Sequence, residues 1–116
     1  MGYIMGKSQR VKGHAFERVI ANDLKSIWPN SKRGIQTQEG GVISDVVNPI
    51  YHFECSCGGQ SIWAKWKQAQ DDSKKNHKIP IVIKKRDREE PVVLLSYKAF
   101  KLMLNMIHGK GCVDET

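Results

Sequence analysis

Long apolar runs are missing from this sequence, and so is the apolar stretch of a secretory signal near its first residues. Cysteine is scarce as well: the three cysteines are an odd number, and two of them are separated by a single residue. We therefore expect neither a membrane-spanning protein nor a secreted domain held by a disulfide framework. A reducing, cytoplasmic setting fits this composition better.

Acidic residues are in short supply relative to basic ones. The 116 residues include 12 Asp and Glu against 19 Lys and Arg, which gives a formal net charge of +7. Much of the surplus is grouped, and the groups nearest the N-terminus are Lys7, Arg10 and Lys12, and Lys32 with Arg33. Grouped basic side chains neutralise phosphates and release counterions, so we expect salt-dependent affinity for nucleic acid. Charge alone leaves open a basic but inert surface.

The length fits one compact domain over 1–116, and a hydrophobic content of 40% fits a single core. Apolar side chains that recur every three or four residues predict helices, and short apolar runs between turn residues predict strands. The expected elements are helices at 14–28, 60–76 and 97–107 and strands near 33–38, 42–48, 50–56, 80–83 and 91–95. This order, αβββαββα, predicts an α/β domain with a mixed central sheet flanked by helices. Residues 1–11 are expected to form a basic flexible arm and residues 108–116 a loose C-terminal tail.

The third expected strand carries the most informative pattern. Alternation across a sheet puts His52, Glu54 and Ser56 on one face. Phe53 and Cys55 fall on the other face, which is the natural core. A carboxylate in a central strand is costly without a partner, so Glu54 is hard to explain as a purely structural residue.

Two further carboxylates are candidates to join Glu54. Asp45 would project toward it if the preceding strand pairs with this one as a hairpin. Carboxylates on adjacent strands suit a hard divalent cation such as Mg2+, which prefers oxygen ligands. Glu17, from the first expected helix, would add a third oxygen directly or through water. Taken alone, Glu17 would be read as an ordinary exposed helix residue, and Asp45 as the end of a strand.

Three segments of the chain stand out together at this point. They are Lys12-Gly13-His14-Ala15-Phe16-Glu17-Arg18, Gly41-Val42-Ile43-Ser44-Asp45-Val46-Val47 and Phe53-Glu54-Cys55-Ser56-Cys57. They resemble the three motifs of the PD-(D/E)XK nuclease superfamily and, within it, Holliday junction resolvases of archaeal and phage type. The likeness covers about residues 7 to 85, and its opening segment is fairly specific to the resolvase branch.

The resemblance implies a restriction-endonuclease-like core and a Mg2+-dependent endonuclease that cuts four-way DNA junctions as a homodimer. The implied setting is the cytoplasm of a bacterial, archaeal or phage-infected cell. One or two Mg2+ ions, with Mn2+ as a possible substitute, would be held by Glu17, Asp45, Glu54 and the backbone carbonyl of Cys55. Gln68 would orient the site or touch a phosphate. The residues implied to contact DNA are Lys7, Arg10, Lys12, Lys32 and Arg33.

Ser56 departs from this pattern, because the superfamily carries a lysine there. That lysine helps to orient the attacking water and offsets negative charge, and a serine hydroxyl has no charge to offer. Three explanations stay open: an engineered replacement that traps an inactive nuclease, a natural loss of activity, or a lysine supplied from elsewhere, with Lys65 and Lys67 as candidates. The first is favoured, so we expect impaired cleavage that Ser56→Lys would raise.

Other readings of the chain belong to different functional classes. The protein would be a non-catalytic module that grips branched DNA, or a nuclease of the same superfamily that acts on duplex DNA. His52, Cys55 and Cys57, with Cys112, invite a zinc site, but alternation separates the histidine from the thiols, and packing of small buried thiols is favoured. The helix at 97–107 and the second helix are the candidate dimer interfaces.

Overall fold

A computed structural model describes residues 2–34, 44–59 and 61–109 of the chain. In chain order the elements are α1 (Gly2–Asp23) with a single 3-10 turn (Leu24–Ser26), β1 (Tyr51–Cys57), α2 (Ile62–Asn76), β2 (Ile79–Lys85), β3 (Val92–Leu94) and α3 (Tyr97–Ile107). Three helices and a three-stranded mixed sheet make a small α/β protein, so the predicted fold class is confirmed at this level. None of the described helices is long and apolar enough to cross a membrane.

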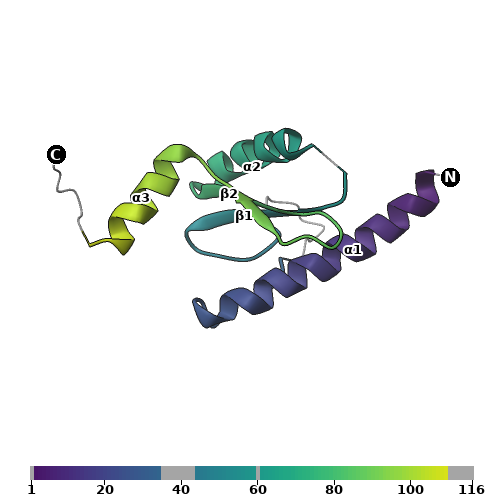
Figure 1. The fold of residues 1–116 in the computed structure, drawn as a ribbon, viewed down its shortest axis with the longest axis horizontal. Helices are drawn as coiled ribbons and strands as arrows, with labels where there is room; N and C mark the ends of the chain where they lie inside the picture. Colours follow the sequence, from purple (N-terminus) through teal and green to yellow (C-terminus); the bar gives the residue numbers. More distant parts are fainter. Residues whose placement is uncertain (1, 35–43, 60, 110–116) are drawn as a thin grey trace.

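The sheet has the order β1-β2-β3, in which β1 and β2 are parallel and β2 and β3 are antiparallel. Parallel neighbours need a crossover, and α2 provides it on one face of the sheet, while α1 lies across the other face (Figure 1). On the free side of β1, single antiparallel bridges join Phe53 to Val46 and Val46 to Arg33. The segment around Asp45 is thereby held beside β1.

The strand expected at 42–48 is wrong as a continuous element over its described part, 44–48, and the strand expected at 33–38 lies mostly outside the described residues. Only Arg33 and Val46 make bridges there, and 35–43 lies outside the described residues. The Asn48 side chain accepts hydrogen bonds from the backbone N–H groups of Ile50 and Tyr51, both at 2.9 Å. An Asx turn of this kind reverses the chain before β1 and shortens the strand that precedes it.

The first helix also differs from its expected bounds of 14–28. It begins at Gly2, so the segment expected as an arm outside the helix is helical, and its flexibility stays a prediction. Residues 2–11 contain no proline and several good helix formers, which explains the longer helix. The helix ends at Asp23, because Leu24–Ser26 tighten into the 3-10 turn. Of the expected tail, 110–116 lies outside the described residues.

The apolar core lies between α1 and the sheet. Phe16 and Ile20 of α1 pack against Phe53 and Cys55 of β1, together with side chains of β2, and all four are buried. This is the face of β1 that alternation assigned to the core. Because these side chains are buried against β1, they fix where α1 crosses the strand. They therefore also fix where the neighbouring residues of α1 lie.

The opposite face of β1 is buried and polar. His52, Glu54 and Ser56 are 0%, 3% and 4% exposed, and α2 covers them. Because an unpaired polar group in such a place costs several kcal/mol, about 2–7 on transfer scales, each of these side chains must find a partner. The partners come from α2 and β2, and they define the candidate site described below.

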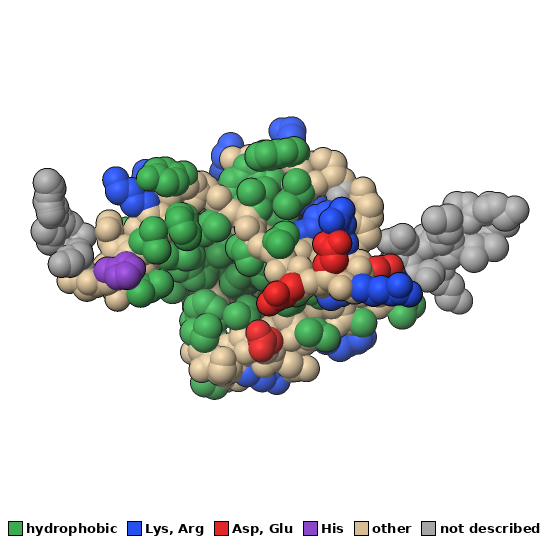
Figure 2. Space-filling view, in the orientation of Figure 1, with side chains coloured by type: hydrophobic (Ala, Val, Ile, Leu, Met, Phe, Trp, Pro, Cys, Tyr) green, Lys and Arg blue, Asp and Glu red, His purple; other side chains and the backbone are tan. Residues whose placement is uncertain are grey.

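α3 is attached mainly through its inner face. Ser96 caps it by accepting the backbone N–H of Ala99, which is buried, and Met103 packs against the core. Its outer face keeps large apolar side chains exposed, and Figure 2 shows hydrophobic side chains gathered over α3 and the adjoining surface. Tyr97 and Ile107, for example, are 77% and 75% exposed. An apolar helix face of this extent is typical of a surface that binds another protein chain.

Candidate metal and phosphate site

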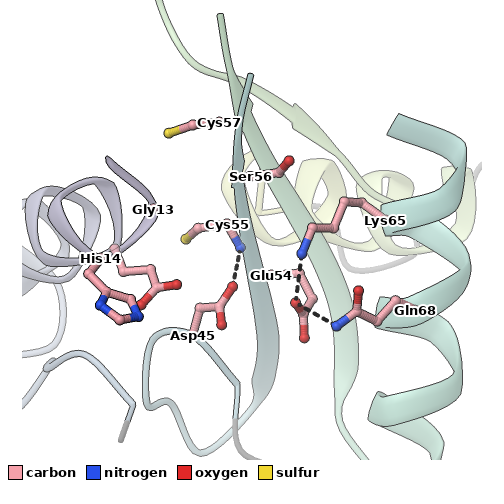
Figure 3. A pocket seen from close by; sticks show the side chains of 10 residues that line it. Gly13, His14, Asp45, Glu54, Cys55, Ser56, Cys57, Lys65 and Gln68 are labelled. Atoms are coloured by element: carbon pink, nitrogen blue, oxygen red, sulfur yellow. Dashed lines mark hydrogen bonds and ion pairs between the residues drawn. The ribbon is translucent and has the colours of Figure 1, made fainter. Parts of the chain in front are cut away.

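A pocket of about 350 Å³ opens between α1, β1 and α2. The three carboxylates singled out from the sequence all line it, and so do two polar residues of α2 (Figure 3). These five residues are Glu17, Asp45, Glu54, Lys65 and Gln68. The structure therefore brings Glu17 of α1 into the same pocket as Asp45 and Glu54, which lie 28 and 37 residues further along the chain.

Asp45 is fixed at the edge of β1. Its carboxylate accepts a hydrogen bond from the backbone N–H of Cys55 at 2.7 Å. Burial raises the pKa of Asp45 to about 7, and the negative charges of Glu54 and then Glu17 add to the rise, while the Cys55 hydrogen bond opposes it. A cation in this pocket would relieve the same repulsion.

Glu54 has partners on both of its oxygens. The His52 imidazole lies with Nε2 2.8 Å from Oε2, buried between β1 and α2. On the pocket side, Oε1 accepts a hydrogen bond from the Gln68 amide at 3.4 Å and faces the Lys65 ammonium at 3.7 Å. Glu54 is thus held by one histidine behind it and by two side chains of α2 beside it.

Glu17 reaches the pocket from α1 and is paired with Arg33. The Arg33 Nε donates a hydrogen bond to Glu17 Oε1 at 2.9 Å, and both side chains are largely buried. Arg33 was predicted as a DNA contact, and that role stays a prediction; in the structure its side chain pairs with Glu17. Glu17 is the carboxylate of α1 that the burial of Phe16 in the core carries toward β1.

The other predicted DNA contacts lie along α1 and before Arg33. Lys12 is exposed and pairs with Asp87 at 3.0 Å, and this hydrogen bond lowers the pKa of the Asp87 carboxyl. Lys32 is exposed. Lys7 and Arg10 fall in the first turns of α1. A role of these residues in DNA binding stays a prediction.

The three carboxylates do not close around a single point. Among the described residues, the group of three whose ligand atoms all lie within 4.8 Å of one another is His52, Glu54 and Asp72. Glu17 and Asp45 are outside it. Ligands of one Mg2+ ion lie about 2.1 Å from the ion, so direct coordination by all three predicted carboxylates would require side-chain movement. The direct hydrogen bond between His52 and Glu54 accounts for the closeness of those two side chains.

Ser56 is buried and has a lysine as its neighbour. Its register partner on β2 is Lys84, whose ammonium donates hydrogen bonds to Ser56 Oγ at 3.2 Å and to the Gly58 carbonyl at 2.9 Å. Burial lowers the pKa of Lys84, and the nearby charge of Lys65 lowers it further. Sequence reasoning missed Lys84, because no local pattern reveals which residues of two strands separated by a helix stand opposite each other.

The two lysines proposed as substitutes for the motif lysine lie in different surroundings. Lys65 lines the pocket, and its side chain is 16% exposed. The Lys67 side chain is 79% exposed and pairs with Asp71 along the surface of α2. Gln68 lies beside Glu54, as the resemblance implied.

The cysteines are not arranged as a zinc site within the described part of the chain. Cys55 is in the apolar core, on the opposite face of β1 from His52, and Cys57 follows it on the same face. Burial raises the pKa of both thiols, which disfavours the thiolate that zinc needs. Cys112 lies outside the described residues.

No known family model, curated protein or solved structure matches this chain. Function is therefore argued from the pocket itself. Three residues that were not predicted to belong to the catalytic or metal site contact its members: His52, Arg33 and Lys84. A signal for His52 was present, since alternation put it on the face of Glu54. The contact of Arg33 with Glu17 depends on the path of the chain and has no local signal.

Proposed function

We propose that this protein is a Mg2+-dependent DNA endonuclease that cuts four-way junctions. The observation that carries the proposal is the pocket between α1, β1 and α2, which Glu17, Asp45 and Glu54 all line and in which burial, with added repulsion from Glu54 and Glu17, raises the pKa of Asp45. Acidic groups that perturb one another in a cleft are typical of functional sites. Glu17 and Glu54 each have a basic side chain nearby, whereas Asp45 is held by a backbone N–H and lines the pocket with the other two carboxylates.

The donor set fits a hard cation. Asp45 and Glu54 offer carboxylate oxygens on adjacent segments, and Mg2+ commonly uses one or two protein carboxylates and keeps several waters. Glu17 would act through water, because Arg33 already engages one of its oxygens. The Cys55 carbonyl stays a proposed further ligand. When bound, Mg2+ supplies charge that polarises the scissile phosphate and acidifies water.

The reaction is hydrolysis of a phosphodiester. A water oxygen forms a bond to phosphorus, one bridging P–O bond breaks, and the leaving oxygen takes a proton, which gives a phosphomonoester and a hydroxyl. Asp45 is assigned to the metal and not to proton transfer, because a bound cation favours the ionised carboxylate and would lower the pKa that burial raises to about 7. The proton of the attacking water passes to solvent. Gln68 holds Glu54 from α2 and presents the rest of its amide to the pocket.

The finer part of the fold proposal is a restriction-endonuclease-like core. It is supported by the antiparallel bridges that join Arg33, Val46 and Phe53, followed by the parallel pair of β1 and β2 across α2. The choice of DNA is supported by the formal net charge of +7. The choice of four-way junctions rests on the resemblance of the segment from Lys12 to Arg18.

Two symmetric cuts across a junction require two equivalent sites, so we propose a homodimer. The exposed apolar face of α3 supports this part of the proposal, because it gives a second copy an apolar surface to cover. The α3 face lies at the opposite end of the molecule from the first turns of α1 (Figure 1). A dimer formed through α3 would leave the α1 arms of the two copies free to approach DNA.

The proposal is tested with synthetic four-way, flap and linear DNA, each incubated with the protein in Mg2+ or in EDTA. We expect Mg2+-dependent cleavage that prefers the four-way junction and is lost in Asp45→Asn and Glu54→Gln. Cleavage of linear duplex at an equal rate would favour the duplex nuclease. Selective junction binding without cleavage in any divalent ion would favour the non-catalytic module. The serine at position 56 favours this alternative, because the motif lysine is absent there.

A further inference from the structure

The ammonium group of Lys84 lies beside position 56, where the motif lysine would stand. The two residues are register partners on β1 and β2, and the Lys84 ammonium lies 3.2 Å from the Ser56 hydroxyl. A lysine at position 56 would put a second ammonium against the first, and like charges on directly opposite residues are destabilising. Serine at this position is therefore matched to its neighbour and is not an isolated defect of the site.

Lys84 does not line the acidic pocket, although its hydrogen-bond partner Ser56 does. Its second hydrogen bond goes to the Gly58 carbonyl, beyond the end of β1, and it is absent from the residues that line the pocket. It serves to hold the end of β1. The cation of the pocket must be sought elsewhere.

Lys65 meets the requirements for that cation. It projects from the first turns of α2 into the same pocket as Asp45 and Glu54, as Figure 3 shows. Its ammonium lies 3.7 Å from Glu54 Oε1, and the side chain is 16% exposed, so its charge is little screened by solvent. An ammonium carries three N–H donors. Among the described residues, Glu54 is the one side-chain partner of the Lys65 ammonium.

We propose that Lys65 supplies, from α2, the positive charge that a strand lysine would supply from position 56, so that the chain cleaves DNA as it stands. This inference rests on the proposed nuclease function. During hydrolysis, negative charge builds up on the non-bridging phosphate oxygens as the water oxygen bonds to phosphorus and the bridging bond breaks. The Lys65 ammonium donates hydrogen bonds to one of these oxygens and gives up no proton.

The test uses the full-length protein with a synthetic four-way junction under single-turnover conditions, with enzyme in excess of its dissociation constant. Lys65→Gln keeps most of the stem and removes the charge. Lys67→Gln is the matched control, because it removes one charge from the same helix outside the pocket. We expect Lys65→Gln to lower the cleavage rate by about 100-fold or more, the loss typical of one electrostatic donor. Junction affinity should change by no more than about threefold in both variants, and Lys67→Gln should cleave at nearly the wild-type rate.

The outcomes separate the inference from the proposed function. Equal cleavage by Lys65→Gln and Lys67→Gln overturns the role of Lys65 and leaves the nuclease proposal intact. If the wild type does not cut but the exchanged pair Ser56→Lys with Lys84→Ser does, the acidic site stands and the inference fails. If neither protein cuts in Mg2+ or Mn2+, both fail. A melting curve of each variant identifies loss of folding, and Lys65→Arg, which keeps the charge, then provides the second comparison.

Discussion

The imidazole of His52 and the carboxylate of Glu54 meet at 2.8 Å in the layer between β1 and α2, where both are buried. An ionised carboxylate only accepts hydrogen bonds, so Nε2 of the imidazole is the donor. The other ring nitrogen, Nδ1, has no partner among the described residues. His52 thus fixes the orientation of Glu54 from behind the pocket.

Replacement of His52 should destabilise the fold. His52→Leu puts an apolar side chain of similar size in place of the imidazole. It removes the hydrogen-bond donor and leaves Glu54 Oε2 buried and unpaired. We expect a loss of about 1–3 kcal/mol in the free energy of unfolding, measured by urea denaturation. His108→Leu, at an exposed histidine just after α3 and outside the pocket, should change it by less than about 0.5 kcal/mol. Equal stability of the two variants would mean that this hydrogen bond does not hold Glu54.

Asp45→Asn should change how stability depends on pH. The folded pKa of Asp45, about 7, is above its ordinary value of 3.8, so the folded protein binds more protons than the unfolded chain between these values. The contribution of Asp45 is therefore most favourable below pH 4 and is lost as pH rises toward 7. Asparagine does not titrate and still accepts the Cys55 hydrogen bond.

In EDTA, Asp45→Asn should gain stability relative to the wild type between pH 4 and pH 8, by roughly 1–4 kcal/mol. Urea denaturation at several pH values measures this difference. A stability difference between the two proteins that does not change with pH would show that the pKa of Asp45 is not raised in the folded protein.

The Glu17–Arg33 pair should be coupled more strongly than a surface pair. Their side chains are 14% and 25% exposed, whereas those of Lys67 and Asp71 are 79% and 53% exposed. A double-mutant cycle with Glu17→Gln and Arg33→Met should give about 1–2 kcal/mol. The same cycle with Lys67→Met and Asp71→Asn should give less than about 0.5 kcal/mol. Similar values for both pairs would indicate that solvent screens the acidic pocket.

The outer face of α3 should control dimer formation. Phe100 and Leu104 lie on it at helical spacing and are 46% and 38% exposed. Phe100→Glu and Leu104→Glu should each weaken the dimer at least tenfold in analytical ultracentrifugation, because a charge would be buried against the partner. Lys98→Glu, on another side of the helix, should leave the dissociation constant nearly unchanged. A wild-type chain that stays monomeric at high concentration would refute the dimer.

The sequence predicted the face pattern of β1 because alternation is a local property. Phe53 and Cys55 enter the core, and Glu54 and Ser56 point toward α2, as expected. The helices were also predicted, since their apolar periodicity repeats over several turns. The ends of α2 and α3 agree closely with the predicted 60–76 and 97–107, but those of α1 do not, because α1 extends to Gly2 through residues of good helix propensity but weak periodicity.

Two contacts around the site, Lys84 with Ser56 and Arg33 with Glu17, could not be predicted, because they depend on how distant segments are aligned. Lys84 meets Ser56 only because β1 and β2 pair in parallel with this alignment, and α2 separates the two strands in the chain. Arg33 meets Glu17 because the segment beside β1 is held by single bridges rather than by a full strand. The arrangement of charge around the pocket thus follows from topology, while the identity of its carboxylates follows from the local pattern.

The most direct test is a crystal of the protein soaked in Mn2+ and measured at a wavelength where Mn2+ scatters anomalously. The proposed site predicts an anomalous peak in the pocket of Asp45 and Glu54, with ordered water between the ion and Glu17. A peak between His52, Glu54 and Asp72, or no peak at an Mn2+ concentration that supports cleavage, would contradict the account.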